Sequence, residues 1–265
     1  MLFLARMKSY RYLHLDVFTD RLFGGNQLAV FLESRGLSSE TMQAIAKEMN
    51  FSETSFVLPP ETGDTDFRVR TFTPDEELPM AGHPTVGTTF ALARAGIVGP
   101  GHGRLVLGLG VGTTPVSLTW RDGELSFVWM SQPAPAFGPP IPDPSGAAAA
   151  LRLSGAAVAA TGLPVQTVSC GVPFLFVPLA TRRAVDSAAL DAPAYDRFIR
   201  AVELDELPVF LFSSENVGDG TTVYSRMFAP GMGIPRIRRL ARPADLWDVT
   251  SCATRSWRPR RPAPS

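Results

Sequence analysis

Cysteine and histidine are scarce in this sequence, and this limits the chemistry available to the chain. Only two cysteines and three histidines occur among 265 residues. Cys170 and Cys252 lie far apart and match no metal-ligand or redox spacing. We expect Cys170 to be a small buried hydrophobic residue, as free cysteines often are. The sequence therefore predicts no metal site.

Long apolar runs are also missing. No stretch approaches the roughly 18 consecutive apolar residues that a membrane-spanning helix needs. Residues 1–6 are apolar but too short for a secretory signal. The alanine-rich stretch at 147–160 is interrupted by Arg152 and is typical of a soluble helix. We therefore expect a cytoplasmic protein with no membrane partner.

The chain has no excess of either charge, because 25 basic residues balance 25 acidic ones. The balance hides a split. Residues 236–265 contain eight arginines and two aspartates, a net charge of +6, so residues 1–235 carry −6. An acidic body does not attract polyanions, and we expect no nucleic-acid partner. A basic tail acting as a nucleic-acid arm is the weaker alternative, since its arginines follow no recognisable pattern.

Glycine-rich phosphate loops and nucleophile elbows are absent too, so neither a nucleotide-binding protein nor a serine hydrolase is indicated.

What the sequence does contain is a mixture of short strands and helices. Hydrophobic periodicity predicts strands at residues 12–18, 28–32, 55–58, 68–72, 104–107, 115–120, 124–130, 174–179, 208–212 and 222–228. Helices are predicted from Ser38 or Ser39 to Met49, from the segment after Gly82 to about Arg94, and at 150–161.

The second half of the chain echoes the first. Arg70-Thr71-Phe72-Thr73-Pro74 resembles Arg226-Met227-Phe228-Ala229-Pro230, each a strand that ends at a proline turn. Proline and glycine crowd residues 132–144, which we interpret as a linker between an N-terminal lobe, 7–131, and a C-terminal lobe, 145–235. Mixed elements in two similar halves indicate an α/β or α+β protein of two related lobes.

Glu53 is the first candidate for chemistry. It lies between a helix end and a strand, beside the hydroxyls of Ser52 and Thr54 and the rings of Phe51 and Phe56. In apolar surroundings desolvation favours the neutral carboxyl, so we expect a pKa raised towards neutrality, suited to proton transfer. The alternative is an ordinary capping or surface glutamate, since most glutamates are solvated.

Gly82-His83-Pro84-Thr85 is the second candidate. Proline suits the first turn of a helix, and the amides there can hold a carboxylate or an oxyanion. His83 at such a position can donate a hydrogen bond or move a proton. The alternative is a plain strand–turn–helix junction.

Asn26, which follows two glycines, is a third candidate for the site, and the alternative is that it simply forms a turn. Asp75-Glu76-Glu77 is expected to be a solvated turn.

These segments together resemble one family, the phenazine-biosynthesis PhzF-like proteins, which are relatives of diaminopimelate epimerase. The match extends from about residue 7 to 235, and its motifs occur in the family's order. They are His14-Leu15-Asp16-Val17-Phe18-Thr19, Gly25-Asn26-Gln27-Leu28-Ala29-Val30, Asn50-Phe51-Ser52-Glu53-Thr54, Gly82-His83-Pro84-Thr85-Val86-Gly87 and Arg226-Met227-Phe228-Ala229-Pro230.

The resemblance implies an α+β fold of two pseudo-symmetric lobes, each a curved mixed sheet wrapped around a central helix. It implies a cofactor-independent isomerase that acts on a small-molecule substrate, with no metal, and that forms homodimers. The family's catalytic residues fall on Glu53 and His83, and its substrate-binding residues on the set Asn26, Ser52, Gly82, Pro84 and Thr85. An epimerase is the second enzyme alternative, but no cysteine stands beside Gly82 for a two-thiol mechanism. A non-catalytic binding protein is the third.

The sequence leaves the family pattern after Pro235. The family continues there with a segment close to E-D-P-A-T-G-S-A, which opens the second lobe's central helix and supplies an acidic catalytic partner. Here Arg236-Ile237-Arg238-Arg239 follows instead. With permitted codons for the residues present, the neighbouring reading frame spells E-D-P-A-T-G-S-A-S-G-P-L-G-C-Y-F-V-R-H. We therefore hypothesise that residues 236–265 are an aberrant basic tail translated out of frame, which leaves the second lobe incomplete.

Overall fold

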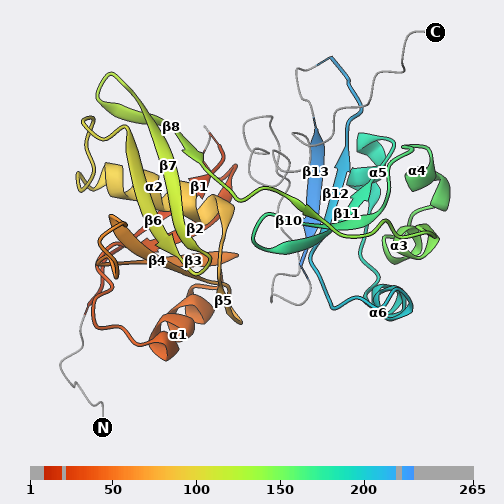
Figure 1. Ribbon diagram of the computed structural model, residues 1–265, viewed down its shortest axis with the longest axis horizontal. Coiled ribbons are helices and arrows are strands. Elements are labelled where there is room, and N and C mark those ends of the chain that lie inside the picture. The colour runs from red at the N-terminus through yellow and green to blue at the C-terminus, as the bar shows by residue number, and fades with distance from the viewer. Residues whose placement is uncertain (1–8, 20–21, 219–222, 230–265) are drawn as a thin grey trace. The chain divides into compact units, whose positions relative to one another are not determined.

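The computed structural model describes residues 9–19, 22–218 and 223–229 (Figure 1). The chain divides into two compact units. The first consists of residues 1–17 and 27–131, and the second of residues 18–26 and 132–265. Each unit contains its own sheet and its own helices, so the described chain is a mixed α+β protein.

An eight-stranded sheet forms the first unit. Its order is β1-β2-β3-β4-β6-β7-β8, with β5 paired to β4. The β2–β3 and β4–β6 ladders are parallel, whereas β3–β4, β4–β5, β6–β7 and β7–β8 are antiparallel. The bounds are β1 Tyr12–Val17, β2 Asn26–Phe31, β3 Glu53–Leu58, β4 Phe67–Phe72, β5 Glu77–Leu78, β6 Arg104–Leu109, β7 Gly112–Arg121 and β8 Glu124–Met130.

Helix α1, Ser39–Met49, covers one face of this sheet. Ser38 caps it by accepting the Thr41 amide, and Asn50 ends it in the left-handed conformation at φ 51°. The buried side chains between helix and strands are Ala29, Phe31, Met42, Ala46, Phe56 and Phe72. Successive strand residues point to opposite faces, so Glu53, three residues before Phe56, lies on the other face.

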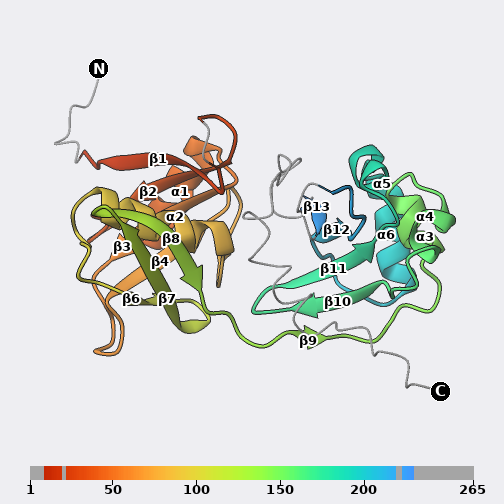
Figure 2. The same cartoon turned by 90° about the horizontal axis from the view of Figure 1, so that it is seen from above.

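Helix α2, Gly82–Arg94, covers that other face and contacts β1, β3 and β8 (Figure 2). It can approach closely because its residues are small. A Cβ on Gly87 would lie 2.6 Å from Leu28 Cδ2 and 2.7 Å from Val17 Cγ2. Both neighbours are buried themselves, so this contact fixes α2 against β1 and β2.

The second unit is a five-stranded sheet of order β13-β12-β11-β10-β9, in which β11 and β12 are parallel. Its helices lie on one side of the sheet (Figures 1 and 2). The strands are β9 Ala136–Phe137, β10 Gln166–Ser169, β11 Pro173–Pro178, β12 Val209–Ser213 and β13 Tyr224–Phe228. The helices are α3 Ser145–Ala150, α4 Gly155–Ala159, α5 Arg182–Ser187 and α6 Ala192–Ala201.

This second sheet carries apolar side chains on both faces. One cluster joins the strands to α3–α6 and includes Leu151, Val177, Tyr195 and Leu211. The other consists of Val168, Phe176, Phe210 and Val223, with the partly buried Phe174, Phe212 and Met227 packed against it. No helix of the described ranges contributes to this second cluster. A sheet with two apolar faces needs a layer on each of them.

The sequence similarity between residues 70–74 and 226–230 extends to the packing of their side chains. The Arg70 guanidinium lies 5.1 Å from the centre of the Phe72 ring, and the Arg226 guanidinium lies 4.6 Å from that of Phe228. Each arginine thus stacks on the phenylalanine two residues further along its strand. The predicted similarity of the two strands therefore extends to how these residues pack.

The second half departs from prediction in several elements. The expected helix at 150–161 is wrong, because the chain leaves helical geometry at Arg152, φ 56°, between α3 and α4. Strand β10 and helices α5 and α6 were not predicted, although Asp191 caps α6 by accepting the Ala194 amide. The predicted linker contains β9. The predicted tail, 236–265, lies outside the described residues.

No helix among the described residues is both long and apolar enough to cross a membrane. Cys170 is buried as predicted, at 8% exposed, but it is disulfide-bonded, so the expectation that it behaves as a free cysteine is wrong.

Gly87→Ala tests the packing of α2. We expect the free energy of unfolding to fall by up to about 2 kcal/mol, because overpacking costs about 1–3 kcal/mol and a helix-propensity gain of about 1 kcal/mol offsets part of that cost. Gly155→Ala is the matched control, since that helical glycine has nothing within 4 Å of its added Cβ. Equal stability of the two variants in chemical denaturation would contradict the packing described.

Candidate active site

Glu53 is the first residue of β3, and the end of α1 places it there. The Asn50 amide donates to Ala46 O at 3.1 Å, which closes the helix and turns the chain towards the sheet. Phe51 and Ser52 complete the turn, and Glu53 then pairs with Leu28 of β2. The side chain faces α2, and the residue as a whole is only 7% exposed. The solvated alternative for Glu53 is therefore wrong.

His83 is the second residue of α2. The helix begins after Ala81, which offers no capping side chain, and Pro84 has no N–H in its first turn. The amides of Gly82 and His83 belong to the helix start, where intrahelical acceptors are absent and the macrodipole favours negative charge. His83 is 8% exposed.

The two predicted catalytic residues meet. His83 Nε2 lies 3.1 Å from Glu53 Oε2, and each side chain is 9% exposed. A buried carboxylate requires a partner, because removing its charge from water is costly. The pair is thus both a structural requirement and a place where one proton can be held between two groups.

The pKa of Glu53 differs from the sequence-based expectation. Burial raises the pKa of this carboxyl, but attraction to His83, together with hydrogen bonds from His83 and Ser52, outweighs burial and holds the pKa below its ordinary value. The expected shift towards neutrality was wrong because the partner lies 30 residues away in the sequence. The lowered pKa favours the ionised form of the Glu53 carboxylate.

Ser52 and Thr85 flank the pair. The Ser52 hydroxyl donates to Gln27 O at 3.4 Å, and Ser52 also helps to lower the pKa of the neighbouring Glu53 carboxyl. The Thr85 hydroxyl donates to Ala81 O at 2.6 Å and so braces the first turn of α2. Gly82 and Pro84 lie in that same turn.

Asn26 begins β2, one residue before Gln27. Of the seven predicted site residues, the structure gathers Glu53, His83 and Ser52 directly, and Gly82, Pro84 and Thr85 through the first turn of α2. Within the part of the chain that the structure describes, no group of three or more His, Cys, Asp or Glu side chains is arranged to hold a metal ion.

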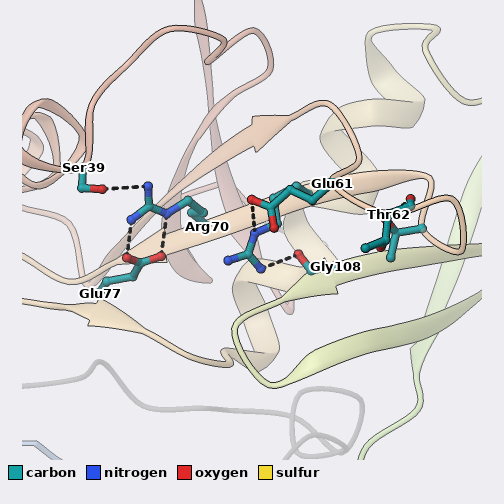
Figure 3. A network of polar contacts seen from close by, with 8 residues as sticks. Ser39, Glu61, Thr62, Arg70, Glu77 and Gly108 are labelled. Carbon is teal, nitrogen blue, oxygen red and sulfur yellow. Dashed lines mark hydrogen bonds and ion pairs between the residues drawn. The ribbon is translucent and has the colours of Figure 1, made fainter.

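The contacts that hold the chain between β4 and α2 were not apparent from the sequence. Asp75-Glu76-Glu77 is exposed as predicted, but Glu77 also accepts two hydrogen bonds from the Arg70 guanidinium (Figure 3). Arg70 also donates to Ser39 Oγ at 3.0 Å. The sequence showed that Arg70 belongs to a segment that resembles residues 226–230. It did not show that Arg70 pairs with Glu77.

The chain is similar to known isomerases. Residues 15–236 match the family model described as phenazine biosynthesis-like protein. An uncharacterized isomerase of Mesorhizobium japonicum is 36% identical over 231 residues, 85% of this chain and 74% of that protein. The trans-2,3-dihydro-3-hydroxyanthranilate isomerase of Pseudomonas aeruginosa is 36% identical over 225 residues, 85% of this chain and 73% of that protein.

Among solved structures, a Bacillus anthracis phenazine biosynthesis protein of the PhzF family superposes with a TM-score of 0.76 at 26% identity. The superposition covers 88% of this chain and 77% of that one. The fold and the comparisons define a member of an isomerase family. The chain belongs to the phenazine biosynthesis-like (PhzF) family and has its diaminopimelate-epimerase-like α+β fold, as the sequence motifs predicted.

His83→Gln tests the cause of the lowered Glu53 pKa. Without the imidazole, burial acts largely unopposed, and the pKa of Glu53 should rise. A carboxyl whose folded pKa is depressed adds stability above its unfolded pKa and loses it as pH falls through the folded pKa. In the variant this contribution should shrink or change sign. Carboxyl 13C titration and denaturation at several pH values measure both effects.

His102→Gln is the control, because His102 lies in the 99–102 turn, where its ring contacts Gly99. An unchanged Glu53 titration in His83→Gln would show that His83 does not set this pKa.

Proposed function

We propose that this protein is a cofactor-independent isomerase that moves a proton between carbons of a small carboxylated substrate. The observation that carries the proposal is the buried Glu53–His83 contact of 3.1 Å at the start of a long helix. The naming of relatives as isomerases, including one that acts on trans-2,3-dihydro-3-hydroxyanthranilate, supports the same reaction class.

Each group has a task in this reaction. Ionised Glu53 removes a proton from carbon and returns it to another carbon of the same conjugated system, a transfer for which one carboxylate is sufficient. His83 keeps Glu53 ionised before the transfer and stabilises charge on the substrate afterwards. Amides at the start of α2 suit a substrate carboxylate. Asn26, Ser52, Pro84 and Thr85 shape the surroundings.

Epimerisation by a thiol pair is disfavoured, since Ala81 precedes Gly82 where a cysteine would be needed. A carboxylate base with an imidazole partner fits a proton shift within one face of a planar substrate better than a two-base inversion. The non-catalytic alternative depends on the second lobe and therefore on the frame of the C-terminal residues.

We also propose that the chain from residue 236 is translated out of frame. Similarity to the family model ends at residue 236, directly after Pro235. The second sheet has an apolar cluster to which no described helix contributes. The hidden frame supplies a small-residue segment at this point, as Gly82–Arg94 follows the equivalent strand in the first unit. The chain as written should therefore be less stable and less active than its frame-restored form.

Glu53→Gln tests the proposed role of the carboxylate. In the frame-restored chain we expect turnover of trans-2,3-dihydro-3-hydroxyanthranilate to fall by about 100-fold to 10,000-fold, the usual share of general acid–base catalysis. Substrate binding should persist in calorimetry. Glu48→Gln, at an exposed position of α1, is the control. Turnover that survives Glu53→Gln would remove Glu53 from the mechanism.

Sequencing the gene across the codons for Gly231 to Arg239 tests the frame proposal. We expect Pro235 and Arg236 codons that permit the hidden frame, such as CCG and AGG, and higher activity once the frame is restored. Codons that cannot encode the hidden segment would refute the proposal.

A further inference from the structure

Residues 73–81, here called the approach segment, connect β4 to α2 and deliver Gly82 and His83 to the site. Three separate contacts hold this segment to the rest of the first unit. The first comes from α1, where Gln43 Nε2 donates to Thr73 O at 2.9 Å and to Pro74 O at 3.0 Å. One amide group thus fixes the beginning of the segment.

The second contact lies in the middle of the approach segment. Glu77 pairs with Phe72 across the β4–β5 ladder, and its carboxylate receives Nε and Nη2 of Arg70 (Figure 3). The same guanidinium reaches Ser39 at the start of α1. A bidentate arginine–carboxylate pair constrains orientation as well as distance.

The third contact lies at the end of the segment. Gly110 and Val111 form the turn between β6 and β7, and the Val111 amide donates to Pro79 O at 3.0 Å. A Cβ on Gly110 would lie 2.7 Å from Pro79 Cα, 2.9 Å from Pro79 O and 3.2 Å from Pro79 C. These are backbone atoms, which cannot rotate away as a side chain can. Only glycine allows the turn to approach this closely.

Upstream of Pro79, Gln43 and Arg70 hold Thr73, Pro74 and Glu77. Downstream, only Met80 and Ala81 separate Pro79 from the first turn of α2. We therefore expect a displacement of Pro79 to move Gly82 and His83, and a contact of 3.1 Å between His83 and Glu53 is sensitive to such a movement.

We infer that the β6–β7 turn, through Gly110, and the Arg70–Glu77 ion pair position the first turn of α2 and so set the Glu53–His83 contact. Gly110 and Glu77 are positioning residues that act through His83. Their significance for catalysis rests on the proposed function, but their effect on the Glu53–His83 pair does not.

Gly110→Ala in the full-length chain is the first test. We expect the ring resonances of His83 to shift and the pKa of Glu53 to rise, because the partner that offsets burial moves away. With only three histidines in the chain, the ring spectrum is simple to assign. Gly103→Ala is the matched control, since nothing lies within 4 Å of a Cβ there, just before β6.

Glu77→Gln is the second test, and it remains informative if Gly110→Ala does not fold. Releasing the ion pair should move the same two signals in the same direction. Glu61→Gln is its control, because Glu61 pairs with Arg68 at 3.4 Å beside the same sheet but outside the approach segment (Figure 3). In an active chain the two positioning variants should lower kcat/KM by about 10-fold to 100-fold, as small misplacements of catalytic groups do.

Folded Gly110→Ala and Glu77→Gln variants whose His83 and Glu53 signals match those of the controls would overturn the inference. If Gly110→Ala does not fold, unchanged signals in Glu77→Gln overturn it, and shifted ones support it. Failure of the proposed function can be told apart from failure of this inference. It would appear as turnover that survives Glu53→Gln, whatever the His83 and Glu53 signals of the positioning variants are.

Discussion

A carboxylate that folding removes from water must find a partner, and in this chain Glu53 finds His83. The contact joins the start of a strand to the start of a helix, so the surrounding elements have to place both ends within hydrogen-bonding reach. Close packing of Gly87 on Leu28 and Val17 sets how near α2 lies to the sheet. The approach segment sets where the helix begins. Much of the first unit is thus arranged around one buried pair.

The pair also explains why Glu53 is ionised when no substrate is present. Burial by itself would raise the pKa of this carboxyl and favour its protonated form, which cannot accept a proton from carbon. The imidazole reverses this effect, with help from the Ser52 hydroxyl. An ionised carboxylate in a buried site fits the proposed reaction, in which the same group removes a proton and later returns it.

The sequence predicted local features well and distant ones poorly. Motifs around Glu53 and Gly82 identified the family, because each motif is contiguous, and they pointed to Glu53 and His83, which the fold brings together. The direction of the Glu53 pKa shift could not be obtained in this way, since it depends on a contact between residues 53 and 83. Gly110 gave no signal at all, because its importance comes from a backbone on another element. In the second half, Arg152 broke a helix that alanine content alone had favoured.

The dependence of kcat/KM on pH, measured on the frame-restored chain, tests the central claim most directly. If Glu53 acts as a carboxylate kept ionised by His83, the acid limb should have an apparent pKa below the ordinary glutamate value of about 4.3. An acid limb near or above pH 6 would contradict the account, because the group that must lose its proton could not then be this carboxylate.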